Sequence, residues 1–296
     1  MNKPIRKAVL PVAGLGTRVL PAAKTVAKEL LNVFDRPIIA YAIAEARAAG
    51  IEHVVMVTGR GKQALEDYFD HNLEVEAMLA AKGRDAELAE LVAELPRAGE
   101  MSFVRQMAPL GLGHAVWCAR EIIGDEPFAV ILPDMLMGGA PSALEETISA
   151  YQAVGGNIVA VEAAPPGQTH KYGIVALGEA APGFEGRLST MRGMVEKPPP
   201  GTEPSNLFIS GRYILQPEIF ALLGEHRKGA GGEIQLTDAM AALMARQSFH
   251  ALEYRGLSYD CGDRVGLLAA NLAMALAHPT LGAQARAAAS AVLAAS

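Results

Sequence analysis

Apolar runs typical of buried strands alternate with helical patterns through the first half of this chain, and this alternation limits its possible folds more than any other feature. The runs are rich in Val, Ile, Leu and Phe and occupy residues 7–12, 53–57, 102–104 and 128–132. Helical patterns lie between them, at about 38–49 and 114–123. Strand-helix-strand alternation favours parallel pairing with helices on both faces of a sheet. We therefore expect an α/β, Rossmann-like, three-layer fold around a mixed central sheet that is mostly parallel.

The remaining segments indicate additions to that sheet, not a second domain. Two polar helical stretches within 67–94 predict a helical surface insertion, and the alanine-rich C-terminal residues predict helices interrupted at Pro279. From Asn157 onward the expected strands are closely spaced. The 296 residues, 51% of them hydrophobic, can form one large core. We expect a single domain over 1–296, built from two halves at about 1–150 and about 151–296.

Composition argues against several classes of protein. The formal net charge is −6 and no cluster of Lys and Arg stands out, whereas nucleic-acid-binding proteins carry a basic surface. The apolar run at 8–13 is too short for a signal peptide, and the segment 265–277 falls short of the ~20 residues that span a bilayer. Cys118 and Cys261 form neither a disulfide framework nor a zinc motif. We expect a cytoplasmic protein with no nucleic-acid or membrane partner.

A glycine turn follows the first expected strand directly, in the sequence Gly14-Leu15-Gly16-Thr17-Arg18. Ligands of such sheets bind beyond the carboxyl ends of the strands, where glycines let backbone N–H groups approach phosphate oxygens. A dinucleotide-binding turn needs a third small residue, but Val19 occupies that position, and the Gly-Lys-Ser/Thr of a Walker-type loop does not follow. Arg18, with Lys24 and Lys28 downstream, instead predicts a cationic site for phosphate.

A carboxylate follows the fourth expected strand. Asp134 comes directly after the run 128–132, which delivers it to the ligand edge of the sheet. Mg²⁺ takes one or two carboxylates together with waters and substrate phosphates, so Asp134 and one further aspartate would suffice. Taken singly, Asp134, Asp260 and the pair Glu196-Lys197 are also compatible with ordinary turns and solvated ion pairs. We interpret His114, at an expected helix start, as structural.

The segment AVLPVAGLGTRVLPAAKTVAKELL, residues 8–31, resembles the opening signature of the sugar-phosphate nucleotidyltransferases, and within them that of the bacterial UTP–glucose-1-phosphate uridylyltransferases. Further blocks continue the resemblance in order, at residues 106, 111–116, 132–134, 172–173, 194–198, 205–207, 211–213, 233–238 and 259–262. The match departs at 25–27, where a proline before the lysine is expected, and at 107–110. Many ordered blocks are more specific than any single motif.

The resemblance implies which residues bind and activate the nucleotide. Arg18 and Lys28 would be catalytic, acting on the triphosphate of UTP. Gln106 and Gly111 would contact the edge of the uracil base. The phosphates would lie against the loop formed by Ala13, Gly14, Gly16 and Thr17.

The resemblance also implies a metal site and a sugar-phosphate site. Asp134 and Asp260 would hold Mg²⁺. Gly173 and Glu196 would hold sugar hydroxyls, and Lys197 would bind the phosphate of glucose 1-phosphate. The first half of the chain would then bind the nucleotide, and the second half, with the C-terminal helices, the sugar phosphate.

The activity that the resemblance implies is transfer of a uridylyl group from UTP to glucose 1-phosphate, which gives UDP-glucose, a polysaccharide precursor, and pyrophosphate. A homo-oligomer, either a dimer or a tetramer, is expected. Direct in-line attack needs no covalent intermediate, because the nucleophile is already an anionic phosphate. Three alternatives remain: a related enzyme that uses dTTP or another sugar 1-phosphate, a non-catalytic regulatory paralogue that binds sugar nucleotides, and a dinucleotide-dependent oxidoreductase.

Overall fold

The computed structural model describes residues 2–295. Within that range nine strands form one sheet, which runs through both halves of the chain. In spatial order they are β5 (Met101–Arg105), β4 (His53–Thr58), β1 (Lys7–Pro11), β6 (Phe128–Ile131), β11 (Leu207–Leu215), β8 (Asn157–Ala163), β12 (Phe249–Glu253), β10 (Leu188–Glu196) and β9 (Gly173–Ala180). Two small ribbons pair β2 (Asn32–Val33) with β3 (Arg36–Pro37), and β7 (Met135–Gly138) with β13 (Leu257–Asp260).

The mixed sheet is confirmed: its four strands from the first half of the chain are parallel to one another, whereas antiparallel pairings predominate among the strands of the second half. The neighbours β5, β4, β1 and β6 are parallel, and so are β8 and β12. The strand β11 is antiparallel to β6 and β8, and β10 is antiparallel to β12 and β9. No α-helix separates β9 from β10 along the chain. Such a short connection suits antiparallel pairing, whereas parallel neighbours need a longer crossover.

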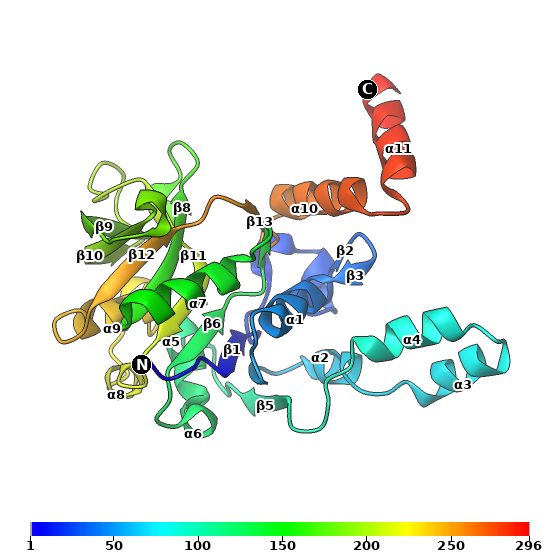
Figure 1. Ribbon diagram of the computed structural model, residues 1–296, viewed down its shortest axis with the longest axis horizontal. Coiled ribbons are helices and arrows are strands. Elements are labelled where there is room, and N and C mark those ends of the chain that lie inside the picture. Colours follow the sequence, from blue (N-terminus) through cyan, green and yellow to red (C-terminus); the bar gives the residue numbers. More distant parts are fainter. Residues whose placement is uncertain (1, 296) are drawn as a thin grey trace.

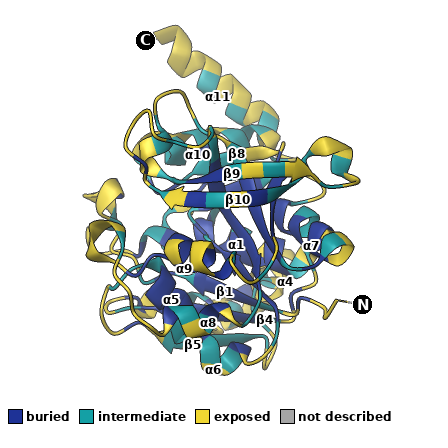
Figure 2. Ribbon diagram, turned by 90° about the vertical axis from the view of Figure 1, so that its left-hand side faces the viewer, coloured by how far each residue is buried: buried dark blue, intermediate teal, exposed yellow. Residues whose placement is uncertain are grey.

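Helices cover both faces of the sheet, which gives the expected three layers. The helices are α1 (Ile38–Ala48), α2 (Gln63–Tyr68), α3 (Leu73–Ala81), α4 (Asp85–Ala93), α5 (Leu112–Cys118), α6 (Arg120–Ile123), α7 (Ala143–Val154), α8 (Ile219–Leu223), α9 (Leu236–Leu243), α10 (Arg264–Ala277) and α11 (Gly282–Ala295). Successive residues of β1 enter opposite cores: Ala8 and Leu10 pack with α1 and α7, and Val9 packs with α5, α8 and α9. This is the two-residue period of a strand buried on both faces. Figure 2 shows the buried strands between helices with exposed outer surfaces.

The sequence predicts the helix near 38–49 correctly, whereas the helix predicted at 114–123 is interrupted. The helix expected near 38–49 is α1, and Gly50 follows it in the left-handed region with φ 81°. The single helix expected at 114–123 is instead two short helices, α5 and α6. At the break, the Arg120 side chain donates to the carbonyl oxygen of Trp117. That carbonyl lies in the last turn of α5, where helical partners run out.

Two helical arms project from the side of the molecule that lies opposite β9 and β10 (Figure 1). One is the expected insertion, a hairpin of α3 and α4. The other consists of the C-terminal helices α10 and α11, which are separated at 278–281. Within residues 2–295, no helix has both the length and the apolar character that crossing a membrane requires.

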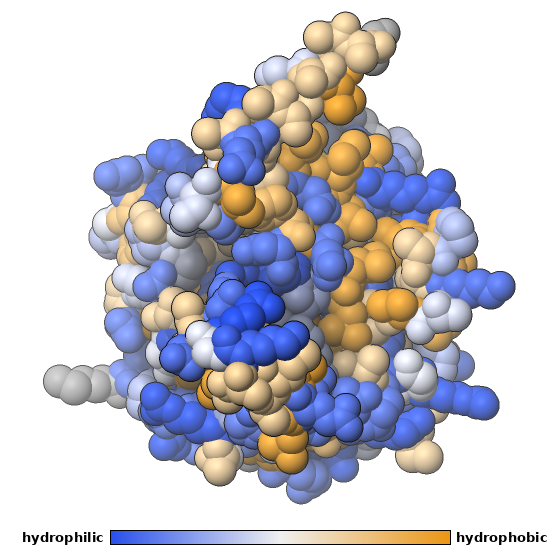
Figure 3. Space-filling view, turned by 90° about the vertical axis from the view of Figure 1, so that its right-hand side faces the viewer, coloured by the Kyte–Doolittle hydropathy of each residue, from blue (hydrophilic) through white to orange (hydrophobic). Residues whose placement is uncertain are grey.

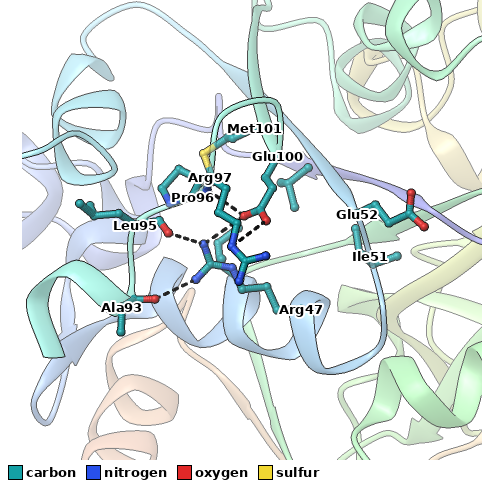
Figure 4. A pocket seen from close by; sticks show the side chains of 11 residues that line it. Arg47, Ile51, Glu52, Ala93, Leu95, Pro96, Arg97, Glu100 and Met101 are labelled. Carbon is teal, nitrogen blue, oxygen red and sulfur yellow. Dashed lines mark hydrogen bonds and ion pairs between the residues drawn. The ribbon is translucent and has the colours of Figure 1, made fainter. Parts of the chain in front are cut away.

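Arg47, near the end of α1, holds the base of the first arm. Its guanidinium donates to the carbonyl oxygens of Leu95 at 2.9 Å, Glu94 at 3.2 Å and Ala93 at 3.4 Å. These carbonyls belong to the last residue of α4 and the two residues after it, where the helix has no further N–H partners. Figure 4 shows Arg47 pointing toward Ala93 and Leu95 beside a cavity of about 400 Å³, with Glu100 close to the same guanidinium.

Candidate active site

The segments that follow β1, β5 and β6 meet around one cavity of about 420 Å³. Parallel strands bring their carboxyl ends to the same edge of a sheet, so residues far apart in sequence converge there. The cavity is lined by most of the residues expected to bind a nucleotide, together with one expected metal ligand: Ala13, Gly14, Thr17, Lys28, Gln106, Gly111 and Asp134.

The glycine turn is packed too closely for larger residues. Gly16 has φ 67°, a left-handed conformation that glycine adopts without strain. A Cβ added there would lie 3.0 Å from the Cβ of Ala23 and 3.2 Å from that of Lys28. A short 3-10 helix, Thr17–Val19, begins directly after this turn and carries Arg18. The turn therefore packs directly against the segment that carries Lys28.

Arg18 forms ion pairs with both expected metal ligands, and Lys28 forms one with Asp134. The Nζ of Lys28 is 2.5 Å from Oδ2 of Asp134. Arg18 reaches Oδ2 of Asp260 at 2.9 Å and Oδ2 of Asp134 at 3.9 Å. Lys24, the third cation of this stretch, is exposed. Two of the three cations predicted near the glycine turn therefore lie on the carboxylates.

The ribbon of β7 and β13 brings the two aspartates together. Met135, next to Asp134, pairs with Asp260 across the ribbon. The backbone N–H of Cys261 donates to the carbonyl oxygen of Asp134 at 2.7 Å. Oδ1 of Asp260 accepts the backbone N–H of Gly262 at 2.8 Å. The backbone of Asp134 is thus tied to the residue that follows Asp260, and the Asp260 carboxylate is held by a backbone N–H of its own turn.

Charge pairing decides the protonation of this cluster. Burial alone would raise the pKa of Asp134, but the neighbouring Lys28 and Arg18 outweigh it and lower that pKa. Burial opposes the charged form of Lys28, yet Asp134 and Glu29 raise its pKa. Burial also opposes the charged form of Arg18, but the negative charges of Asp260 and Asp134 outweigh burial and raise its pKa. The two cations and Asp134 are therefore charged at neutral pH.

The donor set of this cluster fits a hard divalent cation. Asp134, which lines the cavity, and Asp260, which shares Arg18 with it, supply carboxylate oxygens, the ligands that Mg²⁺ takes alongside waters and phosphates. Among residues 2–295, no three His, Cys, Asp or Glu side chains form a group that could hold a metal ion by themselves. The geometry suits a metal shared with a phosphorylated ligand.

Gln106 is buried at the inner end of the cavity, where its amide orientation is fixed. Its Nε2 donates to the carbonyl oxygen of Gly111 at 3.0 Å and lies 3.0 Å from Nδ1 of His114. Burial and the nearby His226 lower the pKa of His114, so its ring is neutral and can accept. In the tautomer of His114 whose Nδ1 accepts, both amide hydrogens are used inside the protein, and the side-chain oxygen remains for a ligand. His114 has the structural role expected of it.

The residues expected to bind the sugar phosphate form a second group. Gly173 pairs with Glu196 in the ladder of β9 and β10, and a Cβ on Gly173 would lie 3.1 Å from Oε2 of Glu196. Thr237 donates to Oε2 of Glu196 at 2.8 Å. Lys197 is 51% exposed, and its Nζ is 3.5 Å from Oε1 of Glu196. Its φ of 47° is unusual for a residue other than glycine, and its N–H donates to Tyr172 at 3.0 Å.

Two tyrosines connect this second group with the aspartates. Burial, followed by the charges of Glu196 and Asp134, raises the pKa of Tyr213. Met135, next to Asp134, packs in one cluster with Ile174 and Tyr172. Burial and the charge of Asp260 also raise the pKa of Tyr172. The structure therefore brings all the expected site residues to one region of the sheet edge.

The structure adds charged residues that the sequence interpretation left without a role. Glu29, next to Lys28, forms a buried ion pair of 2.7 Å with Lys62. Glu45 and Arg212 form a second buried pair, at 2.6 Å. The sequence signal that could have identified these residues is a single charged residue inside an apolar segment, as for Arg212 within β11. At the departure near 25–27, Ala27 has φ −57° and ψ 132°, a conformation that proline also adopts, so the segment keeps its course without proline.

Comparison with known proteins agrees with this geometry. The family model described as Nucleotidyl transferase matches residues 7–275. A UTP–glucose-1-phosphate uridylyltransferase of Bacillus subtilis (strain 168) is 46% identical over 274 residues, which are 93% of this chain and 92% of that protein. A solved structure of a UTP-bound UGPase from Acinetobacter baumannii is 44% identical, with a TM-score of 0.86 over 95% of this chain and 96% of that one.

Another solved structure, a UDP-glucose pyrophosphorylase complexed with UDP-glucose, is 40% identical, with a TM-score of 0.79 over 91% of this chain and 98% of that one. Nucleotidyltransferases generally use a divalent metal ion, which suits the adjacent Asp134 and Asp260. The matched region contains the glycine turn, both aspartates and Lys197. This chain belongs to the nucleotidyl transferase family.

Proposed function

We propose that this chain transfers a uridylyl group from UTP to glucose 1-phosphate, giving UDP-glucose and pyrophosphate. The observation that carries the proposal is one sheet edge at which the glycine turn, the two aspartates with their cations, and the polar group around Glu196 converge. It lies in a chain 46% identical to a protein named for this activity. The nucleotide-binding half is about 1–150, and the sugar-phosphate-binding half is about 151–296, within a single domain.

Uracil would enter the cavity beside Gln106 and Gly111. Because both amide hydrogens of Gln106 are used within the protein, its oxygen is available to accept the N3–H of uracil. Cytosine carries no hydrogen at that nitrogen, so the same contact would disfavour it. The phosphates would follow the loop of Ala13, Gly14, Gly16 and Thr17 toward Arg18 and Lys28. In this arrangement Gln106 acts as an acceptor only, not as the combined donor and acceptor that its amide group allows in isolation.

The reaction is an in-line attack by the phosphate oxygen of glucose 1-phosphate on the α-phosphorus of UTP. Mutual repulsion of two anionic substrates is the main obstacle, and a unit charge pair at 4 Å contributes roughly 4 kcal/mol at an effective dielectric constant of 20. Asp134 and Asp260 would hold Mg²⁺, which would supply positive charge to offset that repulsion. Lys197 holds the attacking phosphate while Gly173 and Glu196 hold the sugar. Arg18 and Lys28 stabilise charge as the bond to pyrophosphate breaks.

The proposal is tested by measuring pyrophosphate release with UTP, glucose 1-phosphate and Mg²⁺, and with each substrate omitted in turn. We expect release only when both are present, with UDP-glucose identified by mass spectrometry. Release from UTP alone, or binding of UDP-glucose without its formation, would contradict the proposal. A panel with dTTP, CTP and other sugar 1-phosphates separates the sister activities, and calorimetry with NAD tests the oxidoreductase alternative.

The two arms support a homo-oligomer, either a dimer or a tetramer; we also propose that the protein is cytoplasmic. Large apolar side chains are exposed on both arms, among them Leu73, Met78, Val265, Leu268 and Leu272. Figure 3 shows hydrophobic side chains gathered on the face from which the arms project. Exposed apolar surface of this kind marks protein contacts. Light scattering should give a multiple of the 31.1 kDa chain mass, and Leu268→Glu with Leu272→Glu should reduce it. A monomeric parent protein would refute this part.

A further inference from the structure

Arg212 lies beneath the proposed metal site and is one of the most completely enclosed side chains of the molecule. Its side chain is 1% exposed, and its partner Glu45 on α1 is 6% exposed. The Nε of Arg212 donates to both oxygens of Glu45, at 3.0 and 3.1 Å, and one terminal nitrogen reaches Oε2 at 2.6 Å. A planar guanidinium on a carboxylate is the geometry that arginine provides and lysine does not.

The remaining donors of Arg212 are directed at the segment that carries Asp134. One terminal nitrogen donates to the carbonyl oxygen of Leu132 at 3.0 Å, and the other to that of Met135 at 2.9 Å. A further contact, at 3.2 Å, goes to the carbonyl of Gly211. All five N–H donors of the guanidinium thus have acceptors, and two of these acceptors flank Asp134.

Glu45 and Arg212 together form what we call the clamp. Glu45 extends the clamp to a third element, α7. Its Oε1 also accepts the backbone N–H of Leu144, at 3.0 Å, in the first turn of α7. Arg212 itself lies opposite Ile131 in the antiparallel ladder of β11 and β6. The pair therefore ties α1, α7 and β11 to the turn between β6 and β7. Asp134 lies in this turn.

We propose that Arg212, held by Glu45, is a positioning residue that fixes the carboxylate of Asp134 for metal binding. The inference rests on the proposed function, because it takes Asp134 as a metal ligand. Mg²⁺ requires near-ideal octahedral geometry, so a small displacement of one ligand weakens binding. Residues that orient metal ligands typically change affinity by about 10–100-fold when they are mutated.

The test is direct binding of Mn²⁺, in the presence of UTP, followed by electron paramagnetic resonance. Arg212→Lys keeps the charge but loses the fork, and we expect its Mn²⁺ affinity to fall by about 10–100-fold. The concentration of Mg²⁺ needed for half-maximal activity should rise by a similar factor, with a smaller change in KM for UTP at saturating metal. Each variant is measured at a temperature at which circular dichroism shows that it is folded.

Arg187→Lys is the matched control. Arg187 pairs with Glu146 at 2.7 Å, is also mostly buried, and donates to the carbonyl of Glu253 away from the aspartates. This variant should lose stability without any change in Mn²⁺ affinity. If Arg212→Lys does not fold, Glu45→Asp shortens the clamp while keeping the ion pair, and the same shift is expected.

Asp134→Asn separates failure of the inference from failure of the proposed function. If Asp134→Asn abolishes Mn²⁺ binding but folded Arg212→Lys and Glu45→Asp retain the affinity of the parent, the clamp is purely structural and the inference is wrong. If Asp134→Asn itself retains Mn²⁺ binding, the assignment of the metal site fails, and with it the basis of the clamp.

Discussion

Arg212 and Arg47 make similar contacts in two very different regions of the molecule. Each guanidinium donates to several backbone carbonyl oxygens and has a glutamate nearby. Arg212 is 1% exposed and lies beneath the substrate edge of the sheet. Arg47 is 35% exposed and holds the base of the hairpin of α3 and α4, with Glu100 at 3.7 Å (Figure 4). The same chemistry therefore operates in a dry interior and in contact with solvent.

The comparison teaches where electrostatic contacts can influence chemistry. Buried charges interact strongly because little water screens them, so a displaced partner at the substrate edge affects every group that the edge holds. Exposed pairs contribute about 0–1 kcal/mol and act only locally. Changes at the substrate edge should therefore alter catalysis, whereas changes at the base of the arm should alter local stability alone.

The strongest test of this contrast is Asp134→Asn. Loss of a ligand to the metal should lower turnover by about 1,000-fold or more, since one close charge contact of roughly 4 kcal/mol corresponds to that factor. Steady-state kinetics over a range of Mg²⁺ concentrations measure the loss, and Asp125→Asn on the opposite side of β6 serves as the control. Activity near that of the parent at saturating Mg²⁺ would remove Asp134 from the mechanism.

Arg18→Ala sharpens the contrast, because Arg18 is 57% exposed although it contacts both aspartates. If it stabilises charge as pyrophosphate leaves, turnover should fall by about 100–1,000-fold, as for loss of a preorganised oxyanion donor. KM for UTP should change much less. An effect on UTP binding alone would contradict this prediction. It would show that the exposed Arg18 helps to bind UTP but does not stabilise charge during the reaction.

Lys197→Ala concerns the other exposed cation of the substrate edge. Because Lys197 is expected to hold the phosphate of glucose 1-phosphate, KM for that substrate should rise by about 10–100-fold, the range for a hydrogen bond to a charged group. Lower turnover can accompany it through a misplaced nucleophile. The measurement varies each substrate in turn, with Lys228→Ala as the control. Unchanged kinetics for glucose 1-phosphate would exclude this role.

Gln106→Ala should produce a smaller effect at a buried and uncharged position. One net hydrogen bond of ~0.5–1.5 kcal/mol implies a several-fold rise in KM for UTP, with glucose 1-phosphate almost unaffected. Discrimination between UTP and CTP should weaken at the same time. A raised KM for glucose 1-phosphate with UTP unchanged would place Gln106 in the other pocket.

Arg47→Ala should have the smallest effect on activity, namely none. Loss of its contacts to the carbonyls at the end of α4 should lower the free energy of unfolding by about 1 kcal/mol. Urea denaturation measures this loss, and limited proteolysis should show faster cleavage between α3 and α4. A tenfold fall in turnover would contradict the separation of the two regions.

Local sequence patterns predicted most of the sheet and the position of Asp134, because strand periodicity and glycine turns act over a few residues. They also indicated where the glycine turn and Asp134 would lie relative to the strands. The orientation of Gln106 could not be predicted, since it depends on Gly111 and His114 in the folded chain. The pairing of Arg212 with Glu45 could not be predicted from the sequence either. Lone charges in α1 and β11 indicate buried partners, but only the fold shows that they belong to each other.

The ribbon of β7 and β13 has a consequence for the order of events during protein synthesis. Arg18 and Asp260 are 242 residues apart along the chain, and the pairing of β13 with β7 brings Asp260 to the substrate edge. A nascent chain that already displays the glycine turn and Asp134 still lacks its last carboxylate. If Asp260 holds the metal as proposed, a nascent chain should be unable to use UTP until the segment through β13 has been synthesised and has paired with β7.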